Sequence, residues 1–210
     1  MNGLALLYVH QGRYEEAEPL YVRAFTLSEK ELGADHPNTA MSLNNLAALY
    51  IRQGRYGEAE QWCKQGLDLF EKGLGADHPN TAMGLNNLVE IYKFQEKYEE
   101  AELLLKRALA IQEKALGAGS PNTATFLSNL AEISDHQGKQ GEAELLMKQA
   151  LAIWERTLGT NHPHMALGLD NLATFYDHQG KEEEAEQLRL RALTICEKAL
   201  GQTIPIQRPA

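Results

Sequence analysis

The chain has 210 residues, with 20 Lys and Arg against 29 Asp and Glu, which gives a net charge of −9. Hydrophobic residues make up 43% and charged residues 23%, a composition that excludes a disordered chain. Alanine and leucine supply 58 residues, whereas valine, isoleucine and threonine supply only 21, so an all-α fold is predicted. The negative charge disfavours nucleic acid as a partner, because phosphate binding requires clustered Lys and Arg.

The sequence gives no sign of membrane insertion or of a disulfide framework. The longest early apolar run, residues 4–9, is too short for a signal peptide or a membrane span. Cys63 and Cys196 lie far apart and in no metal-binding spacing. We therefore expect two free thiols and a reducing, cytoplasmic location.

The chain repeats itself every 42 residues. The string DHPNTA at 35–40 returns at 77–82, and altered copies of it follow at 119–124 and 161–166. The predicted organisation is a single repeat domain over 1–200 with a C-terminal tail at 201–210. Its five repeats cover about 1–36, 37–78, 79–120, 121–162 and 163–200.

Each repeat is predicted to form two helices joined by a short turn. Apolar residues with helical spacing occur at Leu43, Leu46, Ala47 and Tyr50, which predicts a first helix over 37–53 with this stripe facing the core. Gly54 supplies a left-handed residue that ends this helix, and a longer second helix begins near Tyr56. Stacked helix pairs share a continuous core, so the predicted architecture is an α-solenoid.

The histidines before the helices are best explained as helix caps. Prolines suit the first helical position, so the preceding residue is the N-cap in each repeat: His36, His78, Ser120 and His162. A serine hydroxyl and a neutral imidazole nitrogen can both accept a hydrogen bond from a first-turn amide. Capping thus accounts for all four positions, and neither a metal site nor a cofactor is predicted.

The string LNNLAALY at 43–50, followed by QGRYGEAE at 53–60, resembles the tetratricopeptide repeat. The 42-residue period and the LGADHP linkers at 32–37 and 74–79 are similar to the kinesin light chain subtype. The resemblance implies a right-handed superhelix whose first helices line a concave groove that binds peptides or partner proteins. The chain begins inside a first helix and ends in the start of a sixth repeat, so we expect a piece of a larger array or an array without dedicated caps.

Two repeats depart from the shared pattern. Glu96 stands where four repeats have glycine, and Ser134 and Gln140 stand where the other repeats mostly have tyrosine. A residue with a Cβ is costly in a left-handed turn. The third and fourth repeats are therefore predicted to be locally weaker.

The stripe of the first helices that lies off the core is the candidate binding surface. An asparagine recurs there in the four complete repeats, and in two of them a second one precedes it: Asn45, Asn87, Asn129 and Asn171, with Asn44 and Asn86. The family resemblance implies that the repeated asparagines contact bound peptide. The alternative is that each carboxamide ties neighbouring helices together, and the sequence does not choose between the two interpretations.

The rest of this stripe differs between repeats. Its N-terminal part is cationic and apolar, with Arg52, Lys93 and Phe94, and its C-terminal part is acidic, with Glu132, Asp135 and Asp170. Such a groove would orient an extended ligand of opposite polarity, although these residues could also be solvated helix faces. No catalytic motif is present, so an enzyme is not expected.

The leading hypothesis from the sequence is a scaffold that binds a protein or peptide ligand. Two alternatives stay open: a regulatory or sensor segment of a larger ATPase or signalling protein, and a structural module that self-assembles through its uncapped ends into a homo-oligomer.

Overall fold

A computed structural model of the chain describes residues 2–199, which contain ten helices and no strand. The chain divides into two compact units, residues 1–115 and 116–210. The predicted tail at 201–210 lies outside the described residues. The all-α prediction is confirmed for the part of the chain that the structure describes.

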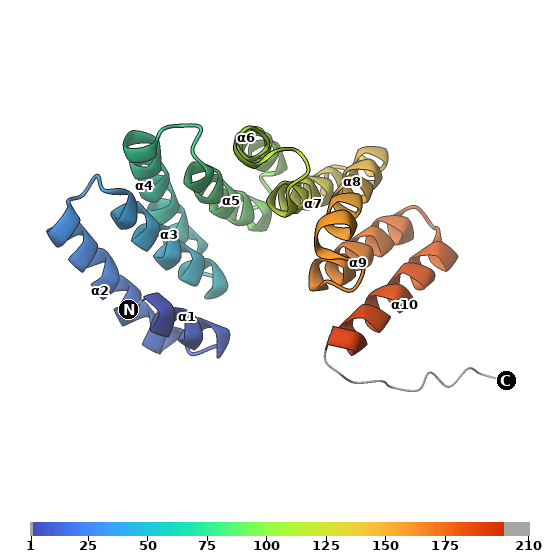
Figure 1. The fold of residues 1–210 in the computed structure, drawn as a ribbon, viewed down its shortest axis with the longest axis horizontal. Helices are drawn as coiled ribbons and strands as arrows, with labels where there is room; N and C mark the ends of the chain where they lie inside the picture. Colours follow the sequence, from blue (N-terminus) through green and yellow to red (C-terminus); the bar gives the residue numbers. More distant parts are fainter. Residues whose placement is uncertain (1, 200–210) are drawn as a thin grey trace. The chain divides into compact units, whose positions relative to one another are not determined.

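Unit 1 contains three pairs of helices. They are α1 (Asn2–His10), α2 (Tyr14–Leu32), α3 (Pro37–Arg52), α4 (Tyr56–Leu74), α5 (Pro79–Phe94) and α6 (Tyr98–Leu116). We call the odd-numbered helices A helices and the even-numbered ones B helices. Within this unit, α1, α3 and α5 form one layer and α2, α4 and α6 the other (Figure 1).

Unit 2 contains two such pairs. They are α7 (Pro121–His136), α8 (Gln140–Leu158), α9 (Pro163–His178) and α10 (Glu182–Ala199). Helix α8 packs against α7 and α9, and α9 packs against α10. From α1 to α5 and from α7 to α10, successive helices therefore pack against each other, as the stacking of helix pairs in a solenoid requires.

The predicted helix caps are all present. The Nδ1 atom of His36 accepts a hydrogen bond from the amide of Asn38 at 3.1 Å, and His78 and His162 cap α5 and α9 in the same way. At the start of α7, the Ser120 hydroxyl accepts from the amide of Thr123 at 3.1 Å. The histidines before the prolines are therefore N-caps.

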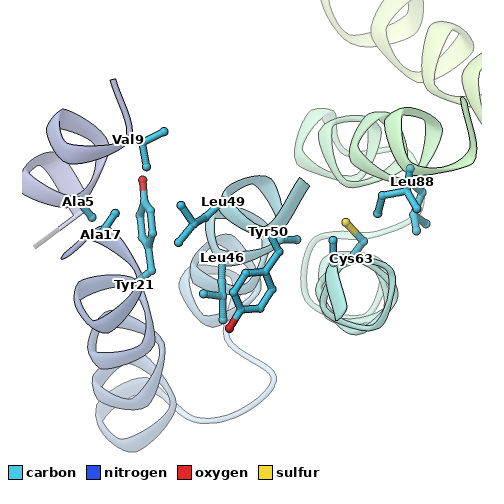
Figure 2. Close-up of a cluster of buried hydrophobic side chains, with 12 residues drawn as sticks. Ala5, Val9, Ala17, Tyr21, Leu46, Leu49, Tyr50, Cys63 and Leu88 are labelled. Carbon is cyan, nitrogen blue, oxygen red and sulfur yellow. The ribbon is translucent and has the colours of Figure 1, made fainter. Parts of the chain in front are cut away.

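The core of unit 1 contains the predicted stripe of α3, with Leu49 in addition, and its counterparts on the neighbouring helices. Leu46 and Leu49 of α3 pack between Ala17 and Tyr21 of α2 and further residues of α1 and α4, and all of them are buried (Figure 2). Removing a side chain of this size from water stabilises the fold by about 1.5–3 kcal/mol. The sequence thus predicted the core face correctly.

Packing between successive pairs also matches large residues to small ones. Leu67 and Phe70 of α4 lie against Gly84 of α5. In unit 2, Leu151 and Trp154 of α8 lie against Gly168 of α9, where an added Cβ would come within 2.9 Å of both side chains. Each glycine therefore makes room for a bulky residue of the preceding B helix.

In α2 and α8, a glutamate near the start of the B helix receives polar groups from the end of the next A helix. Glu18 of α2 accepts hydrogen bonds from the Tyr50 hydroxyl at 2.9 Å and from the Arg55 guanidinium at 3.0 Å. Burial raises the pKa of Glu18, but these bonds and one from Gln53 outweigh it and hold the pKa below its usual value. Glu144 of α8 makes the equivalent contacts in unit 2 with Tyr176, Gln179 and Lys181.

Candidate functional site

The A-helix surface of unit 1 contains a hydrogen bond between two of the predicted site residues. The carboxamide nitrogen of Asn87 on α5 donates to the carboxamide oxygen of Asn44 on α3 at 2.8 Å. Asn44 is buried because α5 packs beside α3 and covers it. The expectation that Asn44 lies exposed in a groove is therefore corrected. At this pair of helices, the asparagine ties neighbouring A helices together.

The neighbouring asparagines of unit 1 remain partly accessible. Asn45 on α3 and Asn86 and Asn87 on α5 are half-buried, between the core and the surface of the A helices. The contact with Asn44 does not use the amide oxygen of Asn87, which is an acceptor. Tying helices together and contacting a ligand are thus compatible roles for this residue.

The C-terminal ends of α3 and α5 carry two exposed residues at equivalent positions one repeat apart, Arg52 and Phe94. Among the described residues, Arg52 has no acidic partner within salt-bridge distance. The ring of Phe94 is 59% exposed and stacks on that of Tyr56, with centroids 4.5 Å apart. Lys93 is different, because its ammonium lies 3.6 Å from Glu90.

In unit 2, the acidic residues that the sequence singled out are engaged within the protein. The side chain of Asp135 on α7 is only 6% exposed, and its Oδ2 atom lies 2.8 Å from Nδ1 of His178 on α9. Asp170 lies 3.8 Å from the guanidinium of Arg189, which also pairs with Asp177. Glu132, Asn129 and Asn171 are half-buried on α7 and α9. Asp135, Asp170 and Asp177 of the predicted acidic end are therefore engaged by neighbouring side chains of the chain itself.

Within residues 2–199, no group of His, Cys, Asp and Glu is arranged to hold a metal ion. The rings of His162 and His164 stack 5.1 Å apart, and that of His164 also stacks on Trp154 at 5.2 Å. Burial, together with the neighbouring His162, lowers the pKa of His164. This histidine pair is thus part of the packing at the start of α9.

Both cysteines are free. Cys63 is buried in the core of unit 1, where burial raises its thiol pKa to about 12, and Cys196 is exposed on α10. None of the helices in the described part of the chain is sufficiently long and apolar to cross a membrane.

Two features of the surface were missed by reasoning from the sequence. The guanidinium of Arg55 lies 4.0 Å above the ring of Tyr50, and its hydrogen bonds join α4 to α2 and α3. The aromatic pair of Tyr56 and Phe94 joins the start of α4 to the end of α5. The sequence did contain a signal for the first feature, because residues equivalent to Tyr50, Gln53, Arg55 and Glu18 recur at the repeat period.

The sequence matches the tetratricopeptide repeat over residues 1–72, 40–114, 85–155 and 123–198. The chain belongs to the tetratricopeptide repeat family. No curated protein matches it significantly. Tetratricopeptide folds commonly mediate protein–protein interaction, and such scaffolds are generally not enzymes.

Several solved structures share the fold. TPR-like repeats ascribed to a kinesin light chain of Podosopora anserina are 28% identical, with a TM-score of 0.77 over 96% of this chain and 95% of that one. BtubC (BKLC) from P. vanneervenii is 26% identical, with a TM-score of 0.78 over 99% of this chain and 82% of its own. The repeats are therefore of the kinesin light chain type.

A more distant match is a Rap protein in complex with Competence and Sporulation Factor. It is 18% identical, with a TM-score of 0.78 over 95% of this chain and 54% of that one. At this identity the likeness shows the shared fold alone.

Proposed function

We propose that this tetratricopeptide chain is a protein-interaction scaffold whose A-helix surface binds an extended peptide or partner segment. The observation that carries the proposal is that Arg52 and Phe94 occupy equivalent positions of α3 and α5, one repeat apart. Within the described residues one is a cation without an acidic partner, and the other is an aromatic ring that is 59% exposed. Arginine and aromatic residues are the side chains most often found at the centre of binding sites.

The chemistry of these residues suggests how a ligand would lie. The half-buried carboxamides of Asn45 and Asn87 can donate to and accept from the backbone of an extended segment without regard to its sequence. Arg52 would take a carboxylate of the ligand, and Phe94 an apolar or aromatic side chain. The expected ligand is a segment with an acidic residue close to an apolar one. The Rap complex with Competence and Sporulation Factor shows that a protein of the same fold binds a partner.

The proposal is tested by screening the full chain against a peptide array and measuring the affinity of the best peptide by fluorescence anisotropy. Replacing Arg52 or Phe94 with alanine removes contacts to the ligand, so each change should weaken binding by about tenfold. Arg52→Ala should leave the melting temperature unchanged, whereas Phe94→Ala also removes the stacking on Tyr56, which contributes about 0.5–1.5 kcal/mol, and should lower it slightly. Raising the salt concentration should weaken binding to the unmodified chain more than binding to Arg52→Ala.

Matched controls lie on the B helices. Arg23 of α2 is an exposed arginine, and Leu103 of α6 is an apolar residue that is 72% exposed. Arg23→Ala and Leu103→Ala should bind the peptide with unchanged affinity. Equal losses in the controls, or unchanged affinity in Arg52→Ala and Phe94→Ala, would contradict binding at the A-helix surface.

A further inference from the structure

Residues equivalent to those that join successive helix pairs also occur at the two ends of the described chain, where they do not make these contacts. Glu186 on α10 is the equivalent of Glu18 and Glu144. It is exposed and makes no hydrogen bond or ion pair with a described residue, because no described A helix follows α10. At the other end, Tyr8, Gln11 and Arg13 are the equivalents of the residues that bind Glu18.

These N-terminal residues are arranged in the same way as the interior residues that bind Glu18. Arg13 donates to Gln11 at 2.9 Å and to Glu16 at 2.6 Å, and it lies 4.3 Å above the ring of Tyr8. The interior counterpart Arg55 donates to Gln53 at 3.1 Å and to Glu58 at 2.7 Å, and it lies 4.0 Å above its tyrosine. The contact that Arg55 has and Arg13 lacks is the one with the glutamate of a preceding B helix.

Apolar residues at the ends of the described chain are likewise exposed where their interior equivalents are buried. Leu4 and Leu7 of α1 are 48% and 50% exposed, whereas their equivalents Leu46 and Leu49 of α3 are each 1% exposed. In unit 2, α9 and α10 border an apolar groove of about 460 Å³ that includes Leu193 and Cys196. In the interior of the array, the equivalents of Leu193 and Cys196 lie against the next A helix.

A second kind of ion pair, between successive B helices, indicates the same stacking arrangement. Arg107 of α6 lies 2.6 Å from Glu71 of α4, and Arg191 of α10 lies 3.4 Å from Glu155 of α8. These contacts join successive B helices. At the same sequence offset, Arg23 of α2 and Glu197 of α10 have no counterpart among the described helices; Arg23 is exposed and Glu197 is half-buried.

We propose that the chain associates head to tail with a second copy of itself, so that α1 and α2 of one copy pack on α9 and α10 of the other. Leu4 and Leu7 pack beside Ala185 of α10, which is the equivalent of the Ala17 that lies in one cluster with Leu46 and Leu49. Arg13 pairs with Glu186, and Arg23 pairs with Glu197. The occupant is a second copy because the N-terminal face carries the side chains that the interior repeats use against the equivalent surface. Such an interface joins two different faces, so it generates chains or rings of copies.

Sedimentation velocity of the full chain, from low micromolar to near-millimolar concentration, tests this proposal. The mass is expected to rise with concentration and to fall with added salt. Glu186→Arg and Arg13→Glu should each weaken association by about tenfold or more, because each places like charges opposite one another. Leu7→Asp should have the same effect.

Mixing the two charge-reversal variants provides the decisive measurement. Every interface in an alternating assembly of Glu186→Arg and Arg13→Glu copies again joins opposite charges, so the mixture should associate although neither variant does alone. Leu103→Asp, on α6 and away from both end faces, is the control and should associate like the unmodified chain. Circular dichroism confirms that each variant is folded.

Three results would overturn the proposal. One is a chain that stays monomeric at every concentration. The others are association that both charge reversals leave unchanged, and association lost in Leu103→Asp but kept in Leu7→Asp.

Discussion

Replacing Glu96 with glycine should stabilise the chain, because the turn after α5 holds this residue in a left-handed conformation. The φ angle of Glu96 is 58°, and the equivalent glycines of the other repeats, such as Gly54 with 73°, lie in the same region. The amide of Lys97 donates to the carbonyl of Tyr92 at 2.9 Å, just as the amide of Arg55 donates to that of Tyr50. The geometry of the turn therefore does not depend on which residue occupies it.

The expected gain follows from two opposing terms. A residue with a Cβ loses about 1–2 kcal/mol in the left-handed region. Glycine increases the conformational entropy of the unfolded chain, which offsets about 0.4–1 kcal/mol of the gain. Glu96 is exposed, so little else is lost with its side chain. The net stabilisation is about 0.5–1 kcal/mol, which corresponds to a rise of about 1–4 °C in melting temperature for a chain of this size.

Thermal and urea unfolding followed by circular dichroism measure this change. The matched control is the reverse substitution Gly54→Glu, whose site has no atom within 4 Å of an added Cβ, so that only the backbone conformation is at issue. Gly54→Glu should lower the stability by a similar amount. A lower or unchanged stability for Glu96→Gly, or a Gly54→Glu variant as stable as the parent, would refute the reasoning.

Three further predictions concern single positions. Asn87→Ala removes the donor to buried Asn44, so the free energy of unfolding should fall by about 1–3 kcal/mol, more than in Asn45→Ala, as urea titration would show. Gly168→Ala forces a Cβ against Leu151 and Trp154 and should cost about 1–3 kcal/mol in the same assay, whereas Gly141→Ala, with open space around it, should stabilise by up to about 1 kcal/mol. Cys196 should react with a thiol reagent in the native protein and Cys63 only after unfolding, because burial raises the pKa of the latter to about 12; equal native reactivity would contradict this assignment.

The sequence by itself determined the local structure. The apolar spacing around Leu46 predicted the core face of α3, and the prolines predicted where α3, α5, α7 and α9 begin. The caps at His36 and Ser120 and the strained turn at Glu96 were also predicted correctly. These features depend on residues within one or two turns of helix, so their physical causes lie in adjacent sequence.

Tertiary structure alone decided which polar side chains of the A-helix surface are available to a ligand. Asn44 is buried and Asp135 engaged by His178 because the next A helix, about one repeat later in the chain, packs over them. Arg52 and Phe94 keep their exposure although they occupy the same stripe. A repeat pattern gives each residue its face on a helix, but the side chain it meets depends on how neighbouring helices approach and on the particular residues they carry.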